Sequence, residues 1–162
     1  MRSMLFSLFM ASAFIVSFDA NPSHADIPPA QAKAPAGKVV KVALVGTDQM
    51  RYNLSEIKVP KGAKVELTLT HGGKLPAAAM GHNFVLLKKG VNIAAFATKA
   101  MSAKASGYVH PDQKDQVIAQ SEIVGGGQST VVTFDAPEPG VYDFICTFPG
   151  HYALMKGKFI VE

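Results

Sequence analysis

The chain has 162 residues, of which 48% are hydrophobic and 17% are charged, and its formal net charge at pH 7 is +4. This length and composition suit one globular domain with a substantial core. The charge is mildly basic and forms no dense run of Lys or Arg, so nucleic-acid binding is not indicated, while attraction to acidic partners or anionic membranes is compatible with it. The sequence has no GxGxxG or P-loop pattern, so it gives no indication of a nucleotide site.

Residues 1–25 are predicted to be an export signal that is cleaved after Ala25. Arg2 supplies a positive start, Met4 to Phe18 is an uncharged apolar run, and Ser23 and Ala25 are the small residues that a signal peptidase prefers. The apolar run is shorter than the ~20 residues that a membrane span needs. A buried N-terminal helix and a retained membrane anchor are the alternatives. Export predicts a periplasmic location, with membrane association only if this segment is retained.

Residues 26–37, DIPPAQAKAPAG, are a predicted semi-rigid linker because they are rich in Pro and Ala and lack apolar periodicity. From Lys38 onward, alternation of apolar and polar residues predicts β-strands. The clearest case is residues 64–71, where Val65, Leu67 and Leu69 alternate with polar residues, as in a strand with one buried face. Shorter strands are predicted at residues 39–45, 55–59, 82–87, 117–119, 129–134, 141–146 and 157–161.

One segment departs from the β pattern. Asn92 can cap an Ala-rich helix that extends to about Lys104. The helix face available for packing consists of Ile93, Phe96, Ala97 and Met101. Eight short strands, frequent Gly and Pro turns and one inserted helix predict an all-β Greek-key antiparallel β-sandwich for residues 38–162. Within it, Tyr142 is predicted to form a tyrosine corner.

The candidate site is centred on the only cysteine of the chain, Cys146. In an exported protein, a lone cysteine indicates an intermolecular bridge, a reactive thiol or a metal thiolate. His151 and Met155 follow it in a short connection, CTFPGHYALM, between two predicted strands. His82, at the start of another predicted strand, offers a second imidazole that only the fold can bring close.

These four side chains form the ligand set of a blue-copper electron-transfer site: two imidazoles and a thiolate in a trigonal arrangement, with a distant thioether. Thiolate and thioether favour Cu(I), whereas imidazole serves both oxidation states. A geometry between the preferences of the two states keeps reorganisation small, so an electron can pass without ligand exchange. The sequence therefore predicts one type 1 copper ion that cycles between Cu(I) and Cu(II).

Two separated stretches, MGHNF (residues 80–84) and CTFPGHYALMKG (residues 146–157), closely resemble azurins, within the cupredoxin family. The resemblance extends to GTDQM, LTHGGKLP and VTFDAPEPGVYDF and spans nearly all of residues 38–162. It implies the cupredoxin fold. It also implies Cys146, His82 and His151 as equatorial copper ligands and Met155 as the long axial one.

The resemblance further implies roles for groups around these ligands. The Gly81 carbonyl would be a weak fifth contact, the Asn83 side chain would orient the cysteine loop, and the Phe148 backbone N–H would donate to the thiolate. An apolar patch around an exposed edge of His151 would dock redox proteins such as c-type cytochromes or copper- or haem-containing reductases. The predicted patch consists of Met50, Leu75, Met80, Pro149 and Leu154.

The sequence departs from the azurins at positions that do not touch the predicted ligands. The disulfide expected in azurins is missing, because Val40 and Ala63 occupy the aligned positions, and Phe84 replaces the buried tryptophan of the family. Copper binding is therefore still expected. These differences affect stability and the assignment to azurins proper or to a neighbouring subfamily.

The remaining histidines are assigned no ligand role. His71 is predicted to be a core or near-core histidine satisfied by hydrogen bonds, and His110 an exposed loop residue. Asp143 is predicted to be solvated. A multicopper oxidase or nitrite reductase would need further copper centres, and His71 and His110 are too few and too scattered to supply them.

The predicted function is a soluble, monomeric periplasmic electron carrier without catalytic activity of its own. One alternative is a copper storage or delivery protein, which would share the ligands but lack an apolar docking rim. Another is an enzyme with Cys146 as nucleophile and His151 as base. The sequence offers little support for that enzyme, because no orienting Asn or Asp motif accompanies the pair.

Overall fold

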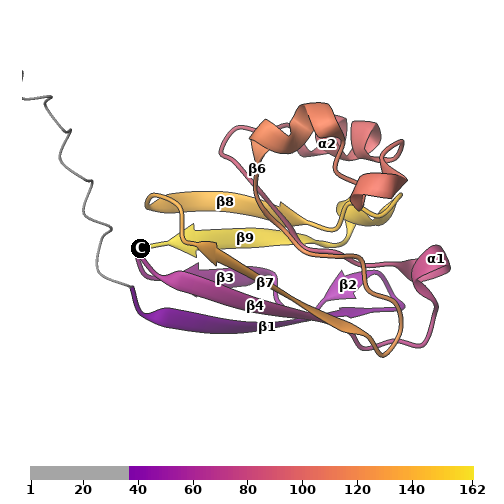
Figure 1. Cartoon of the computed structure of the whole chain (residues 1–162), viewed down its shortest axis with the longest axis horizontal. Helices are drawn as coiled ribbons and strands as arrows, with labels where there is room; N and C mark the ends of the chain where they lie inside the picture. Colours follow the sequence, from indigo (N-terminus) through magenta and orange to yellow (C-terminus); the bar gives the residue numbers. More distant parts are fainter. Residues whose placement is uncertain (1–36) are drawn as a thin grey trace, which may run out of the picture. The chain divides into compact units, whose positions relative to one another are not determined.

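The computed structural model describes residues 37–162, and these form two packed β-sheets with one helical excursion (Figure 1). The predicted export signal and nearly all of the predicted linker lie outside the described residues. Within residues 37–162, no helix combines the length and apolar character needed to cross a membrane.

The first sheet has four strands in the order β2-β1-β4-β7. β1 and β4 run parallel, whereas the β1–β2 and β4–β7 pairs are antiparallel. The bounds of these strands are β1 (Val39–Thr47), β2 (Arg51–Tyr52), β4 (Lys64–His71) and β7 (Ser129–Asp135).

The second sheet has five strands in the order β3-β9-β8-β5-β6. β3 and β9 run parallel, and the other neighbours are antiparallel. The bounds of these strands are β3 (Glu56–Val59), β5 (Val85–Leu87), β6 (Val117–Gln120), β8 (Gly140–Ile145) and β9 (Lys156–Val161).

The predicted β-sandwich is confirmed, with two refinements. All eight predicted strands are present, and β2 adds a ninth that is only two residues long, too short to show alternation in the sequence. Each sheet also contains one parallel pair, so the sheets are mixed where antiparallel pairing was expected. Alternation has the same period in both kinds of pairing, so it identifies a strand without identifying its neighbour.

The main core lies between the two sheets. The predicted inward residues of β4, Val65, Leu67 and Leu69, are fully buried and belong to the same cluster as Phe84 and Phe144 from the second-sheet side. Phe84, where the resemblance expects tryptophan, packs its ring 5.5 Å from that of Phe144 between centroids. Each such buried side chain contributes about 1.5–3 kcal/mol to stability. The strands that end at the candidate site are therefore held in a rigid scaffold.

The inserted helix, α2 (Ile93–Ala100), is capped as predicted, because the Asn92 side-chain oxygen accepts the Ala95 N–H at 3.0 Å. The helix ends at Ala100, before the predicted Lys104. Met101, expected on the packing face, is 49% exposed, because it lies beyond the last helical turn and Ala100 is buried in its place. The remaining helical segments are short: α1 (Ala77–Met80), η1 (Lys104–Ser106), η2 (Pro111–Gln116) and η3 (His151–Ala153).

The tyrosine corner is confirmed. The Tyr142 hydroxyl donates a hydrogen bond of 2.6 Å to the Glu138 carbonyl, four residues earlier. This bond ties the turn that precedes β8 to the strand itself. β8 then leads directly to Cys146, so the corner helps to fix the strand that carries the predicted thiolate.

Candidate metal centre

The fold brings together three of the predicted ligands. The ligand atoms of His82, Cys146 and His151 all lie within 4.8 Å of one another, and all three residues are buried. They come from different elements, since His82 lies just before β5, Cys146 follows β8 and His151 begins η3. The β5–β8 pairing within one sheet therefore places side chains that are far apart in the sequence at one end of the sandwich.

The cysteine loop is closed by its own backbone. The Cys146 N–H donates to the Met155 carbonyl at 2.9 Å, and the Met155 N–H donates to the His151 carbonyl at 2.8 Å. Gly150 adopts a φ of +83°, a left-handed conformation that glycine tolerates without steric cost. This closure places Cys146 Sγ 3.6 Å from His151 Nδ1.

The orientation of His82 leaves one nitrogen without a partner. Its Nε2 lies 2.9 Å from the Thr47 carbonyl, which can only accept, so Nε2 carries the proton and donates. Its Nδ1 is buried and has no hydrogen-bond partner. A buried lone pair of this kind is rare in proteins, whereas a metal-ligating histidine usually donates its other N–H to a carbonyl or carboxylate. The residues present therefore fit a metal ion.

Two further groups border the cluster. Met155 is fully buried and packs in one cluster with Cys146 and Phe148. The Gly81 carbonyl oxygen lies 3.9 Å from Cys146 Sγ. A side chain at Gly81 would be excluded, because its Cβ would lie 2.6 Å from the Ala77 carbonyl oxygen. Met155 and the Gly81 carbonyl thus both border the cluster of His82, Cys146 and His151.

Asn83 links the histidine segment to the cysteine loop. Its side-chain oxygen accepts the Thr147 N–H at 2.9 Å, and its side-chain nitrogen donates to the Thr147 hydroxyl at 2.8 Å and to the Gly107 carbonyl at 2.9 Å. Because Thr147 follows Cys146 directly, these bonds fix where the thiol points. This is the arrangement that the resemblance implies.

Burial is the largest influence on the pKa values of the three side chains in the cluster. It raises the pKa of the Cys146 thiol to about 11, although hydrogen bonds from the backbone N–H groups of Asn83 and Phe148 oppose that rise. Burial also lowers the pKa of His82, and it lowers the pKa of His151 to about 4. At neutral pH both imidazoles are therefore neutral and can offer lone pairs, while the thiol keeps its proton until a cation displaces it.

Comparisons with known proteins decide the family. Residues 39–162 match the model of the copper binding proteins of the plastocyanin/azurin family. The chain belongs to this family. The metal of the family is copper, and the cluster of His82, Cys146 and His151 fits a single type 1 copper site.

Individual relatives agree with this assignment. The chain is 40% identical over 127 residues to azurin of Pseudomonas chlororaphis, covering 75% of this chain and 98% of the relative. It is 42% identical over 120 residues to azurin of Alcaligenes faecalis, covering 72% and 93%. Among solved structures, it is similar to auracyanin A, a "blue" copper protein from Chloroflexus aurantiacus, with a TM-score of 0.70, 31% identity and coverage of 76% and 99%.

For this plastocyanin/azurin family member, the prediction for His71 is confirmed. Its Nε2 lies 2.9 Å from the Met80 carbonyl and its Nδ1 accepts the Gly73 N–H at 3.0 Å, so both ring nitrogens are engaged. The His71 ring stacks on that of His82 at 4.3 Å between centroids, with 10° between the planes. His71 thus supports a predicted ligand, a role that its position in the sequence did not indicate.

The other polar side chains assigned no site role lie outside the cluster. His110, expected to be exposed, is only partly exposed, and its Nδ1 accepts the Asp112 N–H at 3.3 Å and so caps η2. Asp143 is half-buried and forms an ion pair with Lys158, whose Nζ lies 2.5 Å from the carboxylate, so it is paired as well as solvated.

The predicted docking patch is partly exposed, and one expectation about it needs correction. Leu75 and Leu154 are 42% and 50% exposed, while Met50, Met80 and Pro149 are half-buried. His151, expected to show an exposed edge, is only 3% exposed. The loop folds back so that the rings of Phe148 and His82 lie 4.7 Å and 5.2 Å from that of His151 between centroids. The imidazole is therefore covered by neighbouring side chains and shows no exposed edge.

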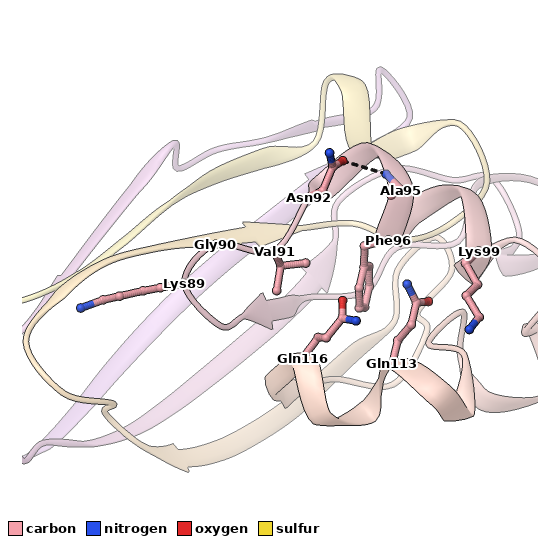
Figure 2. Close-up of a pocket in the computed structure, with 9 residues that line it drawn as sticks. All are labelled: Lys89, Gly90, Val91, Asn92, Ala95, Phe96, Lys99, Gln113 and Gln116. Atoms are coloured by element: carbon pink, nitrogen blue, oxygen red, sulfur yellow. Dashed lines mark hydrogen bonds between the residues drawn. The ribbon is translucent and has the colours of Figure 1, made fainter.

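A surface pocket of about 430 Å³ lies elsewhere, between α2 and η2 (Figure 2). Its lining includes Phe96, Lys99, Gln113 and Gln116, and it includes none of the predicted site residues. The metal cluster is thus not at the base of this pocket.

Sequence reasoning missed two residues at the cluster, Gly46 and Tyr52. A Cβ on Gly46 would lie 2.6 Å from Cδ2 of His82, so a predicted ligand ring packs directly on this glycine. The Tyr52 hydroxyl donates to the Asn83 carbonyl. GTDQM was noticed only as part of the resemblance, and no spacing rule connects either residue to the ligands.

Proposed function

We propose that this protein is a soluble, monomeric one-electron carrier of the periplasm that uses one type 1 copper ion. The observation that carries this proposal is the buried cluster of two neutral imidazoles and a thiol in which His82 Nδ1 has no protein partner. We assign His82 Nδ1, Cys146 Sγ and His151 Nδ1 as equatorial ligands. Met155 would be the axial ligand, with the Gly81 carbonyl as a weak further contact.

The copper ion supplies the one-electron couple between Cu(I) and Cu(II). The chain holds the donor atoms in place before the metal arrives, because the Asn83 bonds and the closed cysteine loop fix them. It also excludes water, since all three residues are buried. Fixed donors in a dry site change little between the two oxidation states, so electron transfer needs little reorganisation.

Two rival functions find less support. An enzyme using Cys146 as nucleophile would need a lowered thiol pKa and access for a substrate. Instead, burial raises the pKa of this thiol to about 11, and the residue is fully buried. A copper storage or delivery protein would share the ligands but has no use for an apolar docking patch, of which Leu75 and Leu154 are the exposed members. Those side chains suit a transient docking surface.

We further propose that redox proteins, such as c-type cytochromes or copper- or haem-containing reductases, dock on this surface. The periplasmic location is supported by the predicted export signal and by the similarity to azurins. Docking on this apolar patch would bring a partner close to His151.

Leu75→Lys tests the docking surface. A lysine there must lose water when the patch is covered, and two copies would bring like charges together. Because ~1.4 kcal/mol corresponds to a tenfold change, we expect electron self-exchange between oxidised and reduced copies to slow by about tenfold or more. Self-exchange can be measured by NMR line broadening at fixed ionic strength, and the copper absorption spectrum should stay unchanged.

Val141→Lys is the matched control, because Val141 is also an exposed apolar side chain, at 52% against 42% for Leu75. It lies at the opposite end of β8 from Cys146, about 16 Å away at ~3.3 Å per residue. This variant should exchange electrons as fast as the wild type. Equal rates for Leu75→Lys and Val141→Lys would contradict the docking surface while leaving the copper assignment intact.

A further inference from the structure

Residues 72–76 connect β4 to α1 and carry Leu75, an exposed member of the predicted docking patch. Met80, another member of the patch, ends α1. This helix has only four residues, and so short a helix has little stability of its own. The positions of both side chains therefore depend on the contacts that this connection makes with the rest of the protein.

Asp48 holds the connection through its carboxylate, which accepts the Lys74 N–H at 2.8 Å and the Leu75 N–H at 3.3 Å. Hydrogen bonds to a charged acceptor are stronger than those between neutral groups. The approach is close, since a Cβ on Gly73 would lie 2.2 Å from Oδ1 of Asp48. Asp48 belongs to the turn between β1 and β2, which also carries Met50 of the docking patch. The carboxylate thus links two segments that contribute to the patch.

The glycine-rich turn between β6 and β7 holds the same connection through its backbone. The Gly126 N–H donates to the Leu75 carbonyl at 2.8 Å. A Cβ on Gly126 would lie 2.5 Å from the carbonyl carbon of Lys74. A Cβ on Gly125 would likewise lie 2.5 Å from the nitrogen of Ala77. Neither glycine has a positive φ, so each is needed here for the close approach of another backbone segment.

These contacts fix the backbone of Leu75 and leave its side chain free. Its N–H is bound by Asp48 and its carbonyl by Gly126, while the residue remains 42% exposed. Surface loops are ordinarily more mobile than the elements they connect. Ordering loops and side chains when an interface forms costs binding free energy, and preorganisation removes part of that cost.

We propose that Asp48 and Gly126 are positioning residues that hold Leu75 in place for docking, so that the patch is already formed in the free protein. This role rests on the proposed docking surface. It affects the rate at which electrons pass between proteins, and it leaves copper binding unchanged, because neither residue is a predicted ligand.

Asp48→Ala and Gly126→Ala test this role independently. The first removes both carboxylate bonds, and the second displaces the Lys74 backbone without changing any charge. In each variant we expect faster hydrogen exchange at the Lys74 and Leu75 amides. We also expect electron self-exchange to slow by about two- to tenfold, the range that corresponds to ordering one side chain at an interface. Both rates can be measured by NMR on the copper-loaded protein at high ionic strength, where surface charges are screened. The copper absorption band should keep its wild-type position.

Asp135→Ala is the matched control for the lost negative charge. Asp135 forms an exposed ion pair with Lys64 at the start of β4, about 23 Å from the end of that strand at ~3.3 Å per residue. The connection that carries Leu75 begins at the other end of β4. This variant should keep the wild-type rates of amide exchange and of electron self-exchange.

The two rates together decide the outcome. Faster amide exchange with a wild-type rate of self-exchange would overturn the inference, because docking would then not depend on a fixed Leu75. Unchanged amide exchange in both Asp48→Ala and Gly126→Ala would also overturn it, because neither residue would then hold the connection. Either result leaves the docking surface standing if Leu75→Lys still slows self-exchange. A wild-type rate in Leu75→Lys would contradict the docking surface itself, and this role with it.

Discussion

Loading with copper should raise the melting temperature of this protein by roughly 10 °C. The donors come together only in the folded chain, so copper binds the folded state selectively and stabilises it by mass action, by about 4 kcal/mol when free copper exceeds its dissociation constant about a thousand-fold. For a domain of this size, each kcal/mol corresponds to a few degrees. Copper would also provide a partner for the buried His82 Nδ1, which has no hydrogen-bond partner in the protein. Unmet hydrogen bonding of a buried group costs ~1–3 kcal/mol.

The missing disulfide makes this contribution more important. Such a bridge typically stabilises by 2–4 kcal/mol, but Cys146 is the only cysteine, and Val40 and Ala63 occupy the positions of the pair expected in azurins. Calorimetry of the copper-loaded and copper-free protein is the measurement. A reductant that neither removes nor reduces the copper should change neither transition. Equal melting temperatures with and without copper would contradict the linkage.

The effect should depend on pH with a defined sign. Because the folded pKa of Cys146 is about 11, each copper ion bound at lower pH displaces the thiol proton, so the copper-induced rise should shrink as pH falls. In the copper-free protein, His151 makes the stability depend on pH. Its pKa is about 4 in the folded protein and 6.5 in the absence of burial, so as pH falls the unfolded chain takes up the proton before the folded protein does. That protein should therefore keep its stability above pH 6.5 and lose it progressively as pH falls toward 4.

Gly46→Ala should weaken copper binding by about 10–100-fold, the range typical when a group that positions a ligand is altered. The added methyl carbon would lie 2.6 Å from Cδ2 of His82 and 3.2 Å from Cε of Met155. The ring of a predicted equatorial ligand and the predicted axial thioether must both move to admit it. We expect lower affinity in a competition titration with a chelator, together with a shifted charge-transfer band.

Ala43→Val is the control for the Gly46 variant. Ala43 lies on the same strand, β1, and its side chain is exposed, so a larger residue there meets no ligand. This variant should bind copper as the wild type does. Wild-type affinity and colour in Gly46→Ala would show that His82 and Met155 do not need the space that the glycine leaves.

Local patterns in the sequence were sufficient to predict the strands and to single out the cysteine loop as a candidate metal site. Alternation such as that of Val65, Leu67 and Leu69 depends only on which face of a strand is buried, so it can be read without knowing the partner strand. The spacing of Cys146, His151 and Met155 is equally local, because one short loop carries all three. For His82, the match to azurins supplied what spacing could not.

Contacts between distant segments could not be predicted in the same way. The parallel pairing of β1 with β4, the stacking of His71 on His82 and the bond from Tyr52 to Asn83 each join segments whose proximity arises only in the folded chain. The burial of His151 also depends on how the cysteine loop closes, which is why the expected exposed edge was wrong. Such contacts leave no periodic trace in the sequence.

The central claim is that Cys146 binds copper as a thiolate in a site that passes single electrons. Optical titration of the Cu(II)-loaded wild type beside Cys146→Ser tests it most directly. The wild type should be intensely blue from thiolate-to-copper charge transfer, should lose its colour on uptake of one electron per copper, and should regain it on reoxidation. Cys146→Ser should show no blue band, because a hydroxyl is a harder and weaker donor. A colourless Cu(II) complex of the wild type, or a blue band that survives in Cys146→Ser, would contradict the account.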